Sequence, residues 1–229
     1  MTDHTAFVIA NTAVASPPLV PELKLHLATE VTPLWHATET TLEQRQLPPP
    51  YWAFAWPGGQ ALARHVLDTP AAVRGKRVVD IGAGSGLTAI AAAMAGASDV
   101  IASEIDPFAG AAIALNAALN DVAVAVETRD FLSTFDPLSA AFSAPFGDID
   151  AGLCLLIGDM CYERPLADRV VAFVRRCAAR GADVLLADPG RAYLPAAGLE
   201  LLAKYDVPTS LDLEDRTVRT TVVYRWQGR

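Results

Sequence analysis

The first indication of chemistry in this chain is a glycine-rich turn that follows a short apolar run, Val78-Val79-Asp80-Ile81-Gly82-Ala83-Gly84-Ser85-Gly86. Glycines at such a turn let the backbone fold tightly and approach a ligand, next to the N–H groups that begin the following helix. A dinucleotide-binding turn reads G-x-G-x-x-G, but Leu87 occupies the position of the third glycine here. The spacing is D-x-G-x-G-x-G, which disfavours a nicotinamide dehydrogenase.

Polar side chains also follow the next two apolar runs. Glu104 lies 20 residues after Gly84, where a carboxylate can accept hydrogen bonds from both hydroxyls of a ribose. Asp130 and Phe131 follow the third run, where a polar group and an aromatic ring can hold an adenine. The alternative for this pair is structural, with Asp130 capping a turn and Phe131 filling the core.

Three further segments place polar and aromatic side chains near predicted strand ends. They are Tyr51-Trp52-Ala53-Phe54-Ala55-Trp56-Pro57-Gly58-Gly59-Gln60, Asp159-Met160-Cys161-Tyr162 and Asp188-Pro189-Gly190-Arg191. Ligands of open α/β sheets bind at the carboxyl ends of the strands, which is where the last segment lies. A Pro-Gly turn explains two of its residues without any function. A structural role would leave the charge of Arg191 unused, so we expect this residue to contact a ligand.

These segments resemble two groups of known enzymes. The turn from Asp80 to Gly86 resembles motif I of the seven-stranded S-adenosylmethionine-dependent methyltransferases, and Asp159 with Tyr162 resembles the D-x-x-Y motif of the family 16 protein-lysine methyltransferases. Within family 16, residues 50–191 are most similar to the members that modify the β subunit of electron transfer flavoprotein and to their bacterial relatives. The resemblance implies S-adenosyl-L-methionine as cofactor and this β subunit as the protein partner. Cys161 departs from the pattern, because relatives often have an aromatic residue at this position. The motif therefore does not determine which residues form the wall of the lysine channel.

The resemblance also implies roles for individual residues. Cofactor contacts are expected from Trp56, Gly58, Asp80, Gly82, Ala83, Gly84, Gly86, Glu104, Ile105, Asp130 and Phe131. Catalytic roles are expected for Asp159 and Tyr162, and substrate binding is expected for Asp188 and Arg191. The four histidines show no ligand spacing, so we expect no metal.

The chemistry limits what Asp159 can do. A sulfonium methyl is already activated, so the enzyme mainly holds the nucleophile in line. That nucleophile is a neutral amine, whereas a free lysine has a pKa of about 10.4. A dry aromatic pocket lowers this pKa and a carboxylate raises it. We therefore expect Asp159 to bind and orient the lysine, with proton acceptance as a weaker option and a cap of the following helix as the structural alternative. Tyr162 would supply a wall and a hydrogen bond.

The elements that must position these residues alternate along the chain from residue 76 onward. We predict strands at 77–81, 99–104, 122–127, 151–157 and 184–187, and helices at 22–30, 59–67, 87–95, 107–119, 165–179 and 195–204. Two β-like stretches, 206–210 and 218–226, close the chain. Near-continuous apolar strands separated by helices indicate a parallel sheet covered on both faces. The predicted fold is α/β, a doubly wound, mostly parallel seven-stranded sheet with an antiparallel last strand, the Rossmann-like methyltransferase architecture. Residues 1–50 are predicted to be a cover segment or linker, and residues 51–229 the methyltransferase domain.

Composition excludes some other classes. The chain has 229 residues, a formal charge of −8 and 52% hydrophobic residues, which fits one compact domain and excludes a disordered chain. The acidic balance argues against a general nucleic-acid binder. Three cysteines without a CxxC pair and an N-terminus without a targeting pattern favour a cytoplasmic, bacterial protein with no membrane segment. A monomer is expected.

Three alternative functions remain open at this point. A ribosomal-protein lysine methyltransferase has a similar motif I, although such enzymes usually show an Asn-containing motif where this chain has Asp159 to Tyr162. A small-molecule N-methyltransferase is the second alternative. A binding module that keeps the cofactor fold without catalysis is the third, and the presence of the glycines and of Glu104 disfavours it.

Overall fold

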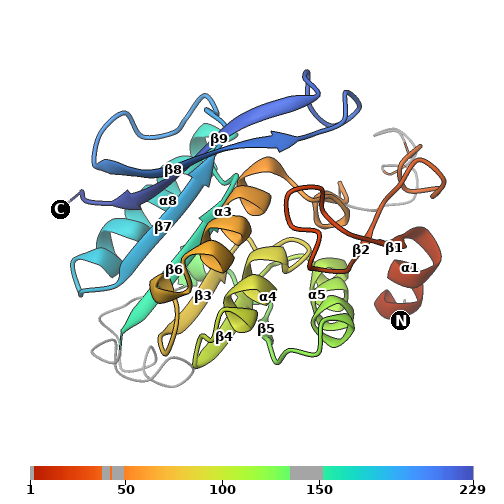
Figure 1. The fold of residues 1–229 in the computed structure, drawn as a ribbon, viewed down its shortest axis with the longest axis horizontal. Coiled ribbons are helices and arrows are strands. Elements are labelled where there is room, and N and C mark those ends of the chain that lie inside the picture. Colours follow the sequence, from red (N-terminus) through yellow and green to blue (C-terminus); the bar gives the residue numbers. More distant parts are fainter. Residues whose placement is uncertain (1–2, 38–41, 43–48, 135–151, 229) are drawn as a thin grey trace.

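The centre of the molecule is a seven-stranded sheet, shown in Figure 1, in a computed structural model that describes residues 3–37, 42, 49–134 and 152–228. Its strands are β3 (Arg77–Ile81), β4 (Asp99–Ser103), β5 (Ala125–Glu127), β6 (Leu153–Gly158), β7 (Asp183–Asp188), β8 (Leu199–Pro208) and β9 (Val218–Trp226). Their order is β5-β4-β3-β6-β7-β9-β8. The first five in this order are parallel, whereas β9 pairs antiparallel with both β7 and β8. The predicted sheet with an antiparallel last strand is confirmed.

Helices cover both faces of this sheet. One face carries α3 (Pro57–Asp68), α4 (Leu87–Met94) and α5 (Pro107–Leu119), and the other carries α8 (Arg164–Ala178) and the short α6 (Phe131–Thr134) (Figure 1). Successive side chains of a strand point to opposite faces. Val78 accordingly packs with Leu62 of α3, and Val79 packs with Phe173 of α8. A strand covered on both sides is apolar at consecutive positions, which is the pattern that predicted this architecture.

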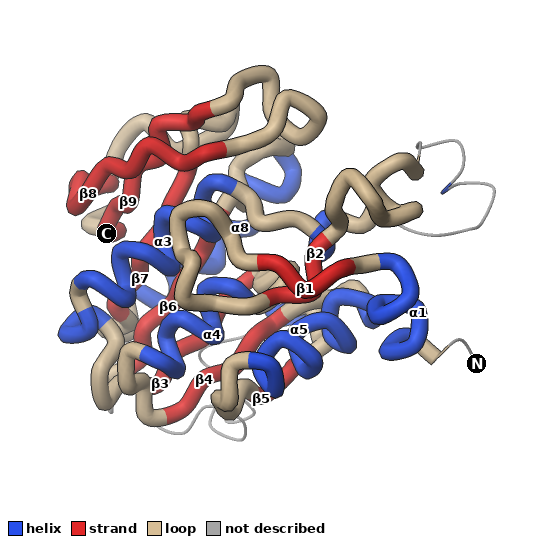
Figure 2. The backbone as a smooth tube through the Cα atoms, turned by 45° about the vertical axis from the view of Figure 1, so that its right-hand side comes forward, coloured by secondary structure: helices blue, strands red, loops and turns tan. Residues whose placement is uncertain are grey.

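The N-terminal segment packs on helices rather than on the sheet. It contains α1 (His4–Asn11), the antiparallel pair β1 (Ala13–Ala15) and β2 (Leu25–Leu27), and the 3₁₀ turn η1 (Tyr51–Ala53). A second 3₁₀ turn, η2 (Pro70–Ala72), follows α3. Figures 1 and 2 show α1 beside α5, and the two elements are in contact. The N-terminal segment therefore forms an outer layer over the helices of one face.

The helix predicted at residues 22–30 is wrong. Leu23, Leu25 and Leu27 are all buried, at every second position, which is the period of a strand. The His26 N–H donates to Asn116 Oδ1 of α5 at 2.7 Å, and Asn116 Nδ2 donates to the Ser85 carbonyl at 2.8 Å. These contacts hold an extended backbone against α5. In a helix, the His26 N–H would bond to a carbonyl four residues earlier and could not donate to Asn116.

The helix predicted at residues 195–204 is also wrong, because this part of the chain enters β8 at Leu199. β8 pairs with β9 from Leu199 to Pro208, and this pairing outweighs the helical preference of its Leu and Ala residues. The β-like stretch predicted at 206–210 is the end of the same strand. The other predicted elements are found with bounds that differ by a few residues, although residue 151 of the fourth predicted strand lies outside the described residues.

The described residues contain neither a candidate membrane span nor a candidate metal cluster. Within the described ranges, no helix has both the length and the apolar character needed to cross a lipid bilayer. The same ranges contain no group of three or more His, Cys, Asp or Glu side chains that could hold a metal ion. The three cysteines are free and buried.

Candidate active site

A cavity of about 530 Å³ opens at the carboxyl ends of the parallel strands. The chain passes from β3 to β4 and β5 on one side and then crosses to β6 on the other side of β3. Loops diverge at such a switch point and leave a crevice for a ligand. The lining comes from the segments after β3, β4 and β6, and from η1, α6 and α8.

The glycine-rich turn after β3 forms the floor of this cavity. Gly82, Gly84 and Gly86 have φ values of 65°, 53° and 80°, a region that favours glycine. Gly82 and Gly84 line the cavity, and a Cβ atom on Gly82 would collide with the Met160 sulfur. Gly86 lies at the N-cap of α4 instead. The turn therefore exposes backbone to the cavity at two of its three glycines.

Asp80 precedes this turn but does not line the cavity. It is 2% exposed, and its Oδ2 accepts a hydrogen bond from the Ala89 N–H at 3.0 Å. Burial raises the pKa of Asp80 to about 8. The hydrogen bond from Ala89 lowers this pKa, and the nearby Glu104 carboxylate raises it by a smaller amount than burial does. The residue holds the first turn of α4 beneath β3.

Glu104, after β4, presents its carboxylate at the wall of the cavity. Its Oε2 accepts from the Gly84 N–H at 3.0 Å, and its Oε1 accepts from the N–H groups of Ile105 at 2.7 Å and Asp106 at 3.2 Å. Burial raises the pKa of Glu104, and these three N–H groups counteract the shift. The carboxylate is thus held in one orientation, directly beside the glycine-rich turn. Ile105 is 65% exposed and lines the same wall.

Asp130 and Phe131 line the cavity beyond β5, and both also have structural contacts. Asp130 Oδ1 accepts from the N–H groups of Leu132 and Ser133, while its Oδ2 accepts from Arg169 Nη2 at 2.5 Å. Phe131 is 3% exposed and belongs to the core between the sheet and α8. The two interpretations of this pair are therefore compatible. Arg169 also lines the cavity, and no sequence motif indicated it.

Asp159, after β6, joins two elements through its two oxygens. Its Oδ2 accepts from the N–H groups of Gly58, at very short range, and Gly59 at 3.3 Å, in the first turn of α3. Its Oδ1 pairs with Arg191 Nη2 at 3.1 Å. Asp159 does cap a helix, but this helix is α3 and not the following α8. Glu163 occupies the N-cap of α8 without a side-chain hydrogen bond.

Burial dominates the electrostatics of Asp159. It raises the pKa of this carboxyl to about 6, although the neighbouring Arg191 guanidinium opposes the shift and Asp188 adds to it. The backbone there is also unusual, because Asp159 has a φ of 55°. Gly58 has no room for a side chain, since a Cβ atom would lie 2.6 Å from the Ala187 carbonyl oxygen and collide with the Asp159 carboxylate.

The expectation that a structural role would leave the charge of Arg191 unused is wrong. Arg191 lies between two carboxylates, with Nη2 at 3.1 Å from Asp159 Oδ1 and at 2.5 Å from Glu214 Oε1. Asp188 does not line the cavity, and its Oδ1 accepts from the N–H groups of Gly190 at 2.7 Å and Arg191 at 2.6 Å. Glu214 is 6% exposed and was not predicted, because nothing in its sequence neighbourhood distinguishes it from a surface acid.

Three aromatic rings form the wall on the α3 side of the cavity. The ring of Tyr51 lies 6.0 Å from that of Trp56 and 6.1 Å from that of Tyr162, between centroids. Trp56 Nε1 donates to the Tyr51 carbonyl at 2.7 Å. Tyr51 and Tyr162 are partly exposed, whereas Cys161 is 2% exposed and is not among the lining residues. The departure at Cys161 therefore lies behind the wall, and Met160 faces the cavity.

The structure brings most of the predicted site residues to this one cavity. Those that line it are Trp56, Gly82, Gly84, Glu104, Ile105, Asp130, Phe131, Asp159, Tyr162 and Arg191. Those that it places outside the lining are Gly58, Asp80, Ala83, Gly86 and Asp188. Lining residues that were not predicted include Tyr51, Trp52, Asp106, Met160 and Arg169. Tyr51, Trp52 and Met160 lie within the quoted motifs, so only their orientation was missing.

A sheet of this order, with a glycine-rich turn and an acidic residue at its switch point, defines an S-adenosylmethionine-dependent methyltransferase of the Rossmann-like class. Residues 61–138 match the family described as ribosomal protein L11 methyltransferase. The electron transfer flavoprotein beta subunit lysine methyltransferase of Rattus norvegicus is 38% identical over 96% of this chain and 82% of its own length, and that of Danio rerio is 37% identical over 98% and 83%. The chain belongs to the family of electron transfer flavoprotein beta subunit lysine methyltransferases.

Comparison with solved structures concerns the fold alone. A chain from Streptococcus mutans, assigned as an S-adenosylmethionine-dependent methyltransferase, matches with a TM-score of 0.50. The match covers 74% of this chain and 49% of that chain at 9% sequence identity.

Proposed function

We propose that this protein transfers the methyl group of S-adenosyl-L-methionine to a lysine ε-amine of the β subunit of an electron transfer flavoprotein. The names of the relatives support this substrate. The observation that carries the proposal is that Asp159 and the aromatic rings of Tyr51, Trp56 and Tyr162 line the same cofactor-sized cavity. A carboxylate and aromatic rings in one lining suit an alkyl chain that ends in an amine.

The residues of the cavity fit the cofactor. Glu104 presents a fixed carboxylate to the ribose hydroxyls, and the backbone of Gly82 and Gly84 allows close approach beside it. We assign the adenine to Asp130 and Phe131, and their place in the lining of the same cavity supports this assignment. A volume of about 530 Å³ is within the range of small-molecule sites. When bound, the cofactor supplies a methyl group that is already activated by its positively charged sulfur.

The acceptor side of the site binds and orients the amine. The rings of Tyr51 and Tyr162 displace water from an incoming lysine side chain that packs against them, which lowers the pKa of the lysine, while Asp159 attracts its ammonium form. Arg191 offsets the charge of Asp159, so that the carboxylate does not trap the ammonium form. The lysine ammonium first releases its proton to solvent. The neutral amine then takes the methyl group, so that a nitrogen–carbon bond forms as the sulfur–carbon bond breaks and S-adenosylhomocysteine is left. Both Asp159 oxygens already accept protein hydrogen bonds, which favours an orienting role over proton acceptance.

Ribosomal protein L11 is the second candidate acceptor, because residues 61–138 match the family described by that name. This match includes the glycine-rich turn and Glu104 but ends before Asp159 and Tyr162. It therefore covers the cofactor half of the site and not the acceptor half. For this reason we favour the flavoprotein subunit.

The remaining assignments complete the proposal. We assign catalysis to residues 51–229 and treat residues 1–50 as a cover, of which residues 3–37 pack on α3, α4 and α5. A monomeric, cytoplasmic and bacterial enzyme that binds no nucleic acid stays our prediction. The two relatives compared above come from a rat and a zebrafish.

The test uses the purified protein, methyl-labelled S-adenosylmethionine and three acceptors in parallel. These acceptors are the β subunit of electron transfer flavoprotein, ribosomal protein L11 and free lysine. We expect label only on the flavoprotein subunit, and peptide mass spectrometry should place it on lysine. Label on L11 or on free lysine, with none on the flavoprotein subunit, would contradict the proposal.

A further inference from the structure

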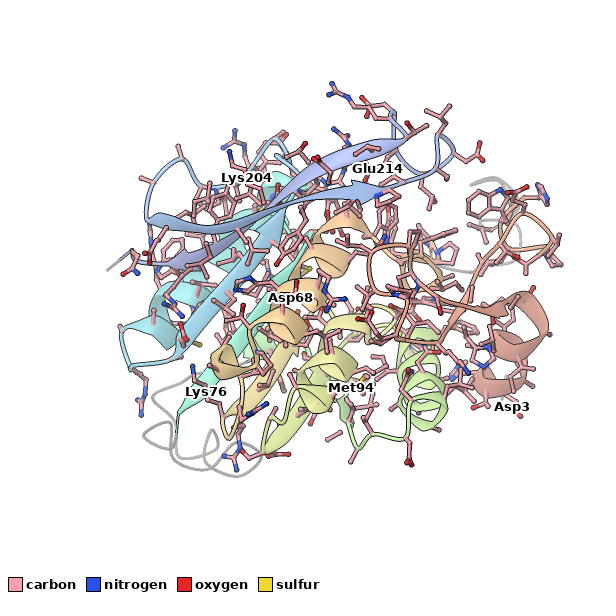
Figure 3. The ribbon with its side chains drawn as sticks, in the orientation of Figure 1. Asp3, Asp68, Lys76, Met94, Lys204 and Glu214 are labelled. Atoms are coloured by element: carbon pink, nitrogen blue, oxygen red, sulfur yellow. The ribbon has the colours of Figure 1, made fainter. Side chains whose placement is uncertain are left out.

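Glu214 is a buried acid outside the cavity lining, and the side chain of Arg191 connects it to Asp159 in that lining. It lies in the connection between β8 and β9, where Figure 3 labels it, and it is 6% exposed. A buried carboxylate is costly unless it is paired and hydrogen-bonded. Arg191 and Arg219 provide these partners from two different parts of the chain.

The contact between Glu214 and Arg191 is a two-point fork. Arg191 Nη2 donates to Glu214 Oε1 at 2.5 Å, and Arg191 Nη1 donates to Oε2 at 3.3 Å. Arg219 Nε and Nη2 approach the same Oε2 at 3.0 Å. A planar guanidinium held at two points has a fixed orientation. Arg191 Nη2 carries a second N–H group besides the one that donates to Glu214. This Nη2 also donates to Asp159 Oδ1, at 3.1 Å.

Asp159 depends on Arg191 on one side only. Its Oδ2 is held by the first turn of α3, whereas its Oδ1 accepts a hydrogen bond from Arg191 Nη2. If the Arg191 guanidinium rotated, Asp159 Oδ1 would lose its hydrogen bond. The carboxylate could then turn, while its Oδ2 stayed bound to the N–H groups of α3. The position of the acceptor carboxylate is thus set by a side chain that Glu214 orients.

We infer that Glu214 is a positioning residue for methyl transfer, acting through Arg191 on Asp159. This inference rests on the proposed role of Asp159 in orienting the lysine. Glu214 touches neither the cavity nor Glu104, so it should affect the transfer step and leave cofactor binding unchanged. The connection between β8 and β9 thereby becomes part of the acceptor site, although it lies behind it.

The test compares Glu214→Gln with Asp215→Asn. Glutamine has nearly the same shape as glutamate but offers one acceptor atom, so the fork to Arg191 is broken. Asp215 is the matched control, because it is 67% exposed and pairs with Arg219 at 3.0 Å without reaching Arg191. A misplacement of about 1 Å can lower a rate on the order of a hundredfold. We expect single-turnover methyl transfer to fall about ten- to a hundredfold in Glu214→Gln and less than about twofold in Asp215→Asn.

Two further measurements separate positioning from a merely structural role. The Kd for S-adenosylmethionine of Glu214→Gln should stay close to that of the wild type. Its urea unfolding midpoint should fall, because Arg191 and Arg219 lose a buried carboxylate, and circular dichroism should show that the variant is still folded under the assay conditions. In an Arg191→Lys background, where the fork is already lost, Glu214→Gln should cause little further decrease in rate. If Arg191→Lys has no measurable rate, the role of Glu214 is decided by comparing the transfer rates of Glu214→Gln and Asp215→Asn.

The outcomes distinguish this inference from the proposed function. A wild type that methylates lysine, together with a Glu214→Gln variant of equal rate, overturns the role of Glu214 alone. The role of Glu214 is also overturned if Glu214→Gln and Asp215→Asn slow the reaction equally. It is likewise overturned if the rate decreases caused by Glu214→Gln and Arg191→Lys multiply in the double variant. A wild type that methylates none of the tested acceptors overturns the proposed function itself.

Discussion

At the scale of single residues, Asp159 illustrates why a structural and a functional interpretation need not compete. Its Oδ2 closes the first turn of α3, and its Oδ1 faces Arg191 at the edge of the cavity. Burial raises its pKa to about 6, so it is mostly ionised at pH 8. The same contacts that satisfy this buried charge also fix the orientation of the carboxylate in the cavity lining.

The first prediction concerns this carboxylate. Asp159→Asn keeps the shape and one acceptor oxygen but removes the charge that attracts the lysine. We expect turnover on the flavoprotein subunit to fall about a hundredfold, with the Kd for S-adenosylmethionine changed by less than about twofold. Steady-state kinetics at pH 8 and calorimetry measure the two quantities. Glu163→Gln, in the neighbouring exposed loop, is the control. A normal rate in Asp159→Asn would leave this residue as a helix cap only.

The second prediction concerns Glu104. Glu104→Ala removes the proposed ribose contact and the acceptor of the Gly84 N–H. We expect the affinity for S-adenosylmethionine to fall by about 1–3 kcal/mol, the range for losing a hydrogen bond to a charged group. Titration calorimetry would measure this change, with circular dichroism to verify the fold. Unchanged affinity would move the ribose contact to another residue.

Local motifs located these residues because each motif lies at one strand end. Glu104 and the glycine-rich turn follow directly from the alternation of apolar runs and helices. Glu214 and Arg169 could not be found in this way. Glu214 meets Arg191 across 23 positions, and Arg169 meets Asp130 across 39, so only the folded chain brings them together.

At the scale of elements, the N-terminus of α3 fits closely against the ends of β6 and β7. A Cβ atom on Gly58 would meet the Asp159 carboxylate and the Ala187 carbonyl oxygen, whereas one on Gly59 would have its nearest neighbour at 3.8 Å. Two adjacent glycines therefore tolerate a methyl group very differently.

The third prediction uses this contrast. Gly58→Ala should push α3 away from Asp159 and cost about 1–3 kcal/mol of unfolding free energy, as overpacking does, and it should slow methyl transfer. Gly59→Ala should be neutral or slightly stabilising, because alanine favours a helix more than glycine does. Urea unfolding and the transfer assay test both variants. Equal effects on stability would show that the end of α3 is not packed as described.

The fourth prediction concerns the junction of β3 and α4. The folded protein holds the Asp80 proton up to about pH 8, whereas the unfolded chain releases it near the ordinary value of 3.8. The free energy of unfolding therefore falls as pH rises through this window, by up to about 1.4 kcal/mol per pH unit. Asp80→Asn keeps the oxygen that accepts from Ala89 and removes the titration. Between pH 6 and pH 8, the cofactor-free wild type should lose more stability than the variant. Parallel urea midpoints would contradict the assignment.

The two wrong helices show what sequence patterns cannot resolve. Residues 25–27 and 199–204 have apolar residues that suit either a strand or a helix over a short stretch. The choice is made by partners far along the chain, which are Asn116 for β2 and the whole of β9 for β8. The strands buried in the parallel sheet were predicted correctly, because both of their faces are apolar.

At the scale of the whole molecule, the outer layer of residues 3–37 is tied to the site indirectly. Asn116 links the backbone of β2 to the Ser85 carbonyl within the glycine-rich turn. Phe108 and Ala109, which begin α5 after Glu104, pack against Val8 of the same layer. The layer therefore supports the helices from which the cofactor loops extend.

The fifth prediction follows from the charge of the molecule. The chain carries −8, and the cavity is lined by four acidic and two basic side chains, Glu104, Asp106, Asp130, Asp159, Arg169 and Arg191. This field favours cations. S-adenosylmethionine carries a sulfonium, and its demethylated product, S-adenosylhomocysteine, has a neutral sulfur and is otherwise alike. Salt shortens the Debye length to about 10 Å at 0.1 M and weakens this attraction.

The affinity of the cofactor should therefore depend on salt more than that of the product. We expect the Kd for S-adenosylmethionine to rise about two- to fivefold between about 0.02 and 0.2 M NaCl at pH 8, with a smaller rise for S-adenosylhomocysteine. Calorimetric titrations of both ligands in the same buffers measure the difference. Because the two ligands share every other group, their comparison isolates the sulfonium charge. Equal salt dependence would mean that Arg169 and Arg191 neutralise the cavity, and that the acidic total of the chain lies elsewhere on its surface.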